Sequence, residues 1–200
     1  MKTKSKALLM TLCAVLLVAA SVLGTMAYLT SQDSVTNTFS IGKIAITLDE
    51  KKVDKNGTEI PNTDRVKAND YKLMPGHAYT KDPTVHVKGD SENSWIFVKV
   101  ENGISAFEAA GDTTIAAQIA ANHWTALDGV ANVYYKEYTK QETVKDIPVF
   151  GNFKIADDAN TKADWSNINA DSTKVIVTAY AVQKDGFDTA KAAWDAAKFN

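Results

Sequence analysis

Cysteine and histidine are scarce in this sequence. The only cysteine is Cys13, and the three histidines, His77, His86 and His123, are separated by 9 and 37 positions. A catalytic zinc needs three protein ligands, and none of these histidines lies in a His-Glu-x-x-His pattern, so we expect no metal site and no other cofactor. The Gly-x-Ser-x-Gly elbow of serine hydrolases is missing as well. These absences favour a protein that is not an enzyme.

The first 27 residues have the pattern of a cleavable signal peptide. Three lysines among the first six residues precede an apolar run over residues 7–23, and small residues follow it. We expect cleavage after Ala27, which makes Tyr28 the mature N-terminus. The alternative is an uncleaved anchor, because a run of 17 apolar residues is at the short limit of what spans a bilayer.

Secretion and a single domain follow from this interpretation. We expect residues 28–200 to form one secreted β-sandwich domain, which contacts a membrane only through the signal peptide before signal peptidase removes it. Removing three of the 22 basic residues leaves 19 against 24 acidic ones, a net charge of about −5, so nothing favours nucleic acid as a partner. Cys13 leaves with the signal, and the mature chain then has no disulfide.

Apolar residues alternate with polar ones in most of the remaining chain, which predicts a mainly β protein. The expected strands are two within residues 35–48, with a change of phase at Gly42-Lys43, and further ones at 84–88, 95–101, 133–138, 144–153 and 174–183. Helical spacing predicts a short inserted helix at 113–122 and a short C-terminal helix at 189–198. This composition indicates an antiparallel β-sandwich.

Two local predictions can be checked against a structure. Residues 84–88 and 95–101 are close in sequence and joined by the turn-like residues 89–93, so we expect them to pair as a hairpin. His86 alternates with Val85 and Val87, which places it on the solvent face of its strand. We read residues 51–70, which are polar and rich in turn signals, as a surface loop or ragged hairpin.

Three segments near the N-terminus form a distinctive combination. Gly-Thr-Met-Ala-Tyr-Leu-Thr at 24–30, Asn-Thr-Phe-Ser-Ile-Gly at 37–42 and the expected strand at 44–48 resemble the export signal and first strand of the TasA/camelysin family. Shorter agreements occur at 73–76, 81–83, 134–137, 179–183, 186–187 and 193–194. The resemblance implies a jelly-roll-like β-sandwich that Gram-positive bacteria export through an ER-type signal peptidase.

The same resemblance implies a structural role. Its best-understood members polymerise into biofilm matrix fibres, in which the mature N-terminal segment of one subunit completes the sheet of the next. In this sequence the corresponding donor is residues 28–41, with Val35, Phe39 and Ile41 as inserting side chains. We therefore expect an extracellular matrix or cell-surface protein whose partner is a second copy of itself. Pairing of the segment with its own domain, a camelysin-like metallopeptidase, and a surface module that binds host protein or glycan are the alternatives.

Overall fold

A computed structural model describes residues 12–13, 16, 43–143, 145–159 and 173–199 of the chain. By internal contacts the chain divides into two units, Met1–Ser40 and Ile41–Asn200, and the fold discussed here is that of the second unit. Within the described ranges, no helix has both the length and the apolar character that a membrane span requires.

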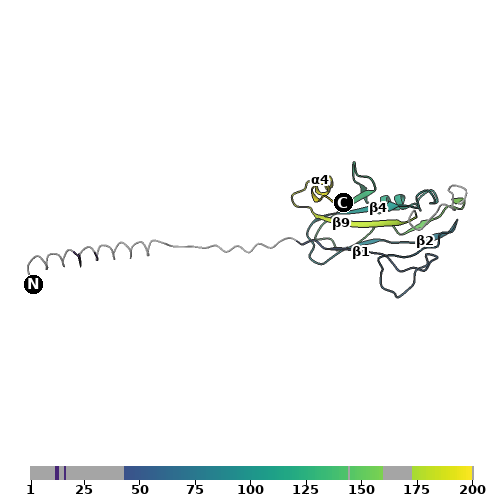
Figure 1. The fold of residues 1–200 in the computed structure, drawn as a ribbon, viewed down its shortest axis with the longest axis horizontal. Helices are drawn as coiled ribbons and strands as arrows, with labels where there is room; N and C mark the ends of the chain where they lie inside the picture. The colour runs from purple at the N-terminus through teal and green to yellow at the C-terminus, as the bar shows by residue number, and fades with distance from the viewer. Residues whose placement is uncertain (1–11, 14–15, 17–42, 144, 160–172, 200) are drawn as a thin grey trace, which may run out of the picture. The chain divides into compact units, whose positions relative to one another are not determined.

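The second unit is built from antiparallel strands in three hydrogen-bonded groups (Figure 1). The first group has the order β1-β3-β7, the second is the pair β2-β8, and the third has the order β5-β6-β4-β9. The strands are β1 (Ile46–Asp49), β2 (Ala78–Thr80), β3 (Thr84–Val87), β4 (Ser94–Asn102), β5 (Thr125–Ala126), β6 (Val133–Tyr138), β7 (Asp146–Pro148), β8 (Asn152–Lys154) and β9 (Val175–Gln183). The mainly β, antiparallel fold predicted from the sequence is thereby confirmed, whereas the jelly-roll order stays a prediction.

The core lies on both faces of β4, the central strand of the third group. Ile96, Val98 and Val100 point into the larger cluster, where they meet Val85 and Val87 of β3. On the opposite face, the alternate β4 residues join a second cluster, which we call the aromatic cluster because partly buried aromatic side chains such as Tyr180 and Trp194 pack against it. Its buried members are Trp95, Phe97, Leu127, Val133, Ala190 and Ala193. Because both of its faces are covered, β4 reads as an almost continuous apolar run.

Two short helices close the fold where the sequence predicts them. Helix α2 (Ile115–Ala121) lies within the predicted range, and the hydroxyl of Thr114 accepts a hydrogen bond from Ala117 N as its N-cap. Helix α4 (Ala190–Ala197) starts after Thr189, whose hydroxyl accepts from Ala192 N in the same way. Helix α4 buries Ala190 and Ala193 against the aromatic cluster and so covers the outer face of β4 and β9.

The predicted hairpin of residues 84–88 and 95–101 is wrong. Strand β3 pairs with β1 and β7, whereas β4 pairs with β6 and β9, so residues 88–93 pass from one sheet to the other. The physical reason is that both strands have buried inward-facing residues, which meet across the core rather than side by side in one sheet.

The predicted strand at 144–153 is interrupted. The structure has β7 and β8 in different sheets, separated by Val149, Phe150 and Gly151. Val149 and Phe150 are fully buried, so this apolar stretch packs into the core without belonging to a strand. Residues 51–70 are a ragged hairpin as expected, held by isolated bridges between Glu50 and Val66 and between Val53 and Glu59.

Candidate functional site

One long side of β9 has no strand partner among the described residues. Lys184 N donates to Asn93 O and Gly103 N donates to Lys174 O, which fixes the even-numbered residues of β9 as those hydrogen-bonded to β4. The N–H and C=O groups of the odd-numbered residues therefore point away from β4. These residues are Val175, Val177, Ala179, Ala181 and Gln183. We call this side the β9 edge.

Strand β1 is likewise the last strand of its sheet. Lys88 N donates to Ala45 O, so the odd-numbered residues of β1 bond to β3, and the backbone groups of Ile46 and Leu48 point outward. Glu50, next on this outward side, exchanges two backbone hydrogen bonds with Val66, which ends the exposed stretch after Leu48. The side chain of Lys67 donates to Leu48 O and partly covers it.

A cavity of about 600 Å³ lies between β1, the loop that follows it and the first half of β9. We call it the edge groove. Its apolar lining comes from both sheets and from the loops between them, and it includes Leu48, Leu73, Ile104, Phe153, Val175 and Val177. Charged side chains such as Asp49, Lys67 and Lys81 complete its wall. The groove therefore combines apolar pockets with two strand edges that carry outward-pointing backbone groups.

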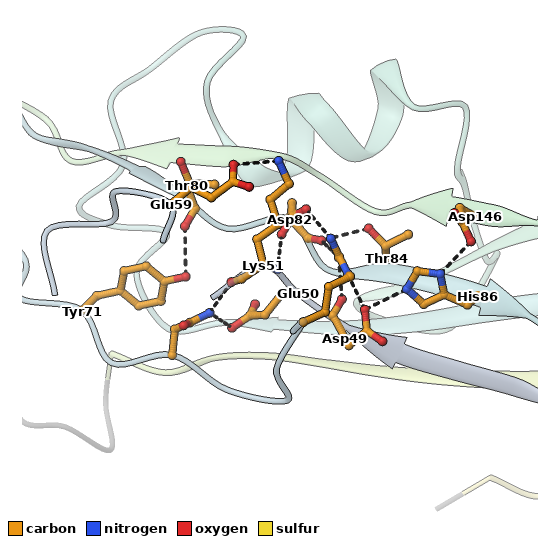
Figure 2. Close-up of polar contacts among 12 residues, drawn as sticks. Asp49, Glu50, Lys51, Glu59, Tyr71, Thr80, Asp82, Thr84, His86 and Asp146 are labelled. Atoms are coloured by element: carbon orange, nitrogen blue, oxygen red, sulfur yellow. Dashed lines mark hydrogen bonds and ion pairs between the residues drawn. The ribbon is translucent and has the colours of Figure 1, made fainter. Parts of the chain in front are cut away.

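A ladder of charged groups crosses the outer face of the β1-β3-β7 sheet (Figure 2). His86, on the central strand, has Nε2 at 2.7 Å from Asp49 Oδ1 on β1 and Nδ1 at 2.7 Å from Asp146 Oδ1 on β7. Both contacts are hydrogen bonds only when the ring carries a proton on each nitrogen. His86 faces outward from its sheet as predicted, but its side chain is only 17% exposed because its carboxylate partners cover it.

Arg65 extends this ladder to the loop before β3. Its Nε donates to Asp49 Oδ1 at 2.5 Å and its Nη1 to Asp82 Oδ2 at 2.9 Å, while Nη2 donates to the backbone oxygens of both aspartates. Burial alone would raise the pKa of the Asp49 carboxyl, but the hydrogen bonds from Arg65 and His86 outweigh it and lower that pKa. We call Asp49, Arg65, Asp82, His86 and Asp146 the polar ladder. It ties β1 to its sheet beside the edge groove.

The described residues contain no group of three or more His, Cys, Asp or Glu side chains arranged to hold a metal ion. His77 instead contacts Asn56 O through Nε2 at 2.9 Å, and His123 is an exposed residue with φ of 60° just after α2. The three histidines therefore lie in separate parts of the fold.

Comparison with known proteins adds no assignment. No known protein family, no curated protein and no solved structure matches this chain. The TasA/camelysin resemblance accordingly stays a sequence-based expectation.

The residues predicted from the sequence to act in export and strand donation are Ala27, Tyr28, Val35, Phe39 and Ile41, and all of them lie outside the described residues. The structure adds an open strand edge, the β9 edge, and the edge groove beside it. Sequence reasoning missed both features because the residues of a strand do not indicate whether that strand lies at the edge or in the interior of its sheet. The polar ladder was missed because its members lie up to 97 positions apart in the sequence, from Asp49 to Asp146.

Proposed function

We propose that this protein is a secreted structural component of an extracellular matrix or cell surface, and that its subunits associate by strand addition. In this proposal residues 28–41 of one subunit lie along the β9 edge of the next. The observation that carries the proposal is the β9 edge itself, whose outward N–H and C=O groups have no described strand partner and border an apolar groove.

The physical chemistry of strand addition matches these features. Backbone hydrogen bonds to an open sheet edge supply sequence-independent affinity, and alternate side chains of the added strand enter pockets beside it. Val35, Phe39 and Ile41 share one parity and would point to one face, toward Val175 and Val177 in the edge groove. The donor segment, about 14 residues long, exceeds the nine residues of β9.

A long strand edge that has no partner among the described residues is a feature that natural sheets usually avoid. Natural sheets protect such edges with charges, prolines or bulges, because an unprotected edge pairs with other chains. The odd-numbered residues of β9, from Val175 to Ala181, are all apolar, and Ile176 on the same strand is 46% exposed. These residues favour an edge that is used for pairing rather than one that is protected from it.

Electron microscopy of the mature chain, residues 28–200, tests the proposal against a chain that begins at residue 42. Incubation at rising concentration should give fibres from the first chain and only monomers from the second. Fibres from the shorter chain would refute donation by residues 28–41. Monomers from both chains at every concentration would instead favour pairing of the segment with its own domain, which needs no second subunit.

A matched pair of proline variants tests the β9 edge. Ala179→Pro removes a backbone N–H that points away from β4, so the fold should persist while assembly is lost. Thr178→Pro removes an N–H that bonds to β4 at Lys99, so it should unfold or strongly destabilise the domain. Circular dichroism separates these outcomes from assembly. A folded Ala179→Pro variant that forms fibres as readily as the parent would rule out the β9 edge as the acceptor.

A further inference from the structure

The carboxylate of Glu50 holds a lysine and an asparagine side chain at the same time, beside the edge groove. Lys81 Nζ lies 2.6 Å from Glu50 Oε2, and Asn69 Nδ2 donates to Glu50 Oε1 at 2.9 Å. One carboxylate thus brings an amine and a carboxamide to its two oxygens. Such a trio contains a nucleophile, an acyl group and a proton carrier, which are the components of an amide-forming reaction.

The lysine and glutamate are well removed from water. Their side chains are 10% and 6% exposed, and the ring of Tyr71 lies over Lys81 Nζ with its centroid 5.8 Å away. Burial raises the pKa of the Tyr71 hydroxyl, and the nearby Glu50 carboxylate raises it further by a smaller amount. The Lys81 amine and the Glu50 carboxylate are therefore in direct contact with little exposure to solvent.

The carboxamide of Asn69 is held in one orientation. Its Oδ1 accepts a hydrogen bond from Val53 N at 3.0 Å, and its Nδ2 donates to Lys51 O at 2.8 Å as well as to Glu50. The Val53 N–H polarises the carbonyl and is placed to stabilise negative charge that develops on Oδ1 during attack at Cγ. Nδ2 meanwhile lies against the carboxyl group that can return a proton to it.

We propose that Lys81 and Asn69 become joined by an intramolecular amide bond, with Glu50 as the group that transfers the proton. Glu50 accepts a proton from the Lys81 ammonium, and the neutral Nζ attacks Asn69 Cγ. The Cγ–Nδ2 bond then breaks as Glu50 protonates Nδ2, and the second proton that Nζ loses on becoming an amide passes to Glu50 and from it to the released ammonia. The products are one secondary amide and one ammonium ion, which leaves through the adjoining edge groove. No oxidant, metal or other reactant is needed.

This bond would close a short ring between the loop that carries Asn69 and the connection from β2 to β3. The ring covalently fixes one wall of the edge groove in a chain whose predicted mature form has no disulfide. The inference does not depend on strand addition, because all three side chains belong to one subunit.

Peptide mapping of the purified full chain tests the bond. In an unlinked chain trypsin releases residues 68–72 and 73–81 as separate peptides. In a linked chain trypsin does not cut after the acylated Lys81, so residues 68–72 should appear joined to residues 73–88. The mass of this joined peptide should be the summed mass of peptides 68–72 and 73–88 minus one ammonia. Fragment spectra should place the link between Asn69 and Lys81. Recovery of only the separate, unmodified peptides from folded protein would overturn the proposal.

Three variants separate this chemistry from an ordinary ion pair. Lys81→Arg keeps the positive charge, and Glu50→Gln keeps the shape and a hydrogen bond to Asn69, yet each should abolish the linked peptide completely. Lys51→Arg is the matched control, because Lys51 pairs with Glu59 at 2.8 Å on the surface and this variant should leave the linked peptide unchanged. A linked peptide that persists in Glu50→Gln at the parental level would remove Glu50 from the reaction.

A second source of lost ammonia must be distinguished. Asn56 is followed by Gly57, a pair that can also release ammonia by cyclising onto its own backbone. That reaction leaves the loss on the peptide that contains Asn56 and joins no two peptides. Ammonia loss confined to that peptide, with no joined peptide found, would count against the proposed bond, and so would a joined peptide that survives in Lys81→Arg.

Discussion

Replacing Arg65 with alanine should destabilise the domain by about 2–3 kcal/mol at neutral pH. The variant removes two hydrogen bonds to carboxylates and two to backbone oxygens. Charge-assisted hydrogen bonds contribute about 1.5–3 kcal/mol each when buried, but exposed ion pairs contribute only about 0.2–1 kcal/mol. The Arg65 side chain is 30% exposed and its two carboxylate partners are 21% and 19% exposed, so each contact should contribute nearer the exposed limit. About 0.5–0.7 kcal/mol for each of the four contacts gives the total of about 2–3 kcal/mol.

The loss should depend on pH in a defined direction. Because the folded-state pKa of Asp49 is lowered, its stabilising contribution is present above the unfolded value, about 3.9, and is lost as the pH falls through the lower folded value. Arg65 is one of the groups that lower this pKa. The difference in unfolding free energy between the parent and Arg65→Ala should therefore be largest at neutral pH and shrink below about pH 4.

Urea unfolding followed by tryptophan fluorescence measures this difference at pH 7 and pH 3. The matched control is Lys51→Ala, which breaks an ion pair whose side chains are 43% and 46% exposed and should cost less than about 0.5 kcal/mol. The reasoning fails if Arg65→Ala is no less stable than this control, or if its deficit is the same at both pH values.

Two further substitutions test local features of the backbone. Gly57→Ala should cost at least about 2 kcal/mol in chemical denaturation, because Gly57 has φ of +76° and the new Cβ would lie 2.7 Å from the Tyr79 Cα. Gly129→Ala is the control: Gly129 has φ of +68° but open space around it, so this variant should cost only about half as much. Equal losses in the two variants would contradict the close approach of Gly57 to Tyr79. Thr189→Ala should lower the unfolding free energy by about 1 kcal/mol through loss of the hydrogen bond to Ala192 N, and an unchanged melting temperature would show that this cap is not needed.

Local sequence patterns were sufficient for most elements of the fold. The alternation in residues 95–101 predicted β4, and the caps Thr114 and Thr189 agree with the two predicted helices. The strand predicted at residues 133–138 has the same bounds as β6. These features depend on side-chain periodicity and on hydrogen bonds within a few residues, so the sequence contains them directly.

Strand pairing and the candidate site could not be predicted in this way. Proximity in sequence favoured a hairpin of β3 with β4, but the burial of Val85 and Ile96 on opposite sheets decided the pairing. His86 was placed on the correct face of its strand, yet its burial depends on Asp49 and Asp146, which are 37 and 60 residues away. Contacts over such separations arise from tertiary packing and have no local signature.

The central position of β4 has a consequence for the order of events in folding. Its two neighbours, β6 and β9, lie well downstream in the chain, and β9 ends at Gln183. The core on both faces of β4 is therefore incomplete until nearly the whole chain is available. Folding of this domain should be a late and slow event governed by long-range contacts, and a nascent chain should remain unfolded until its last strand has been synthesised.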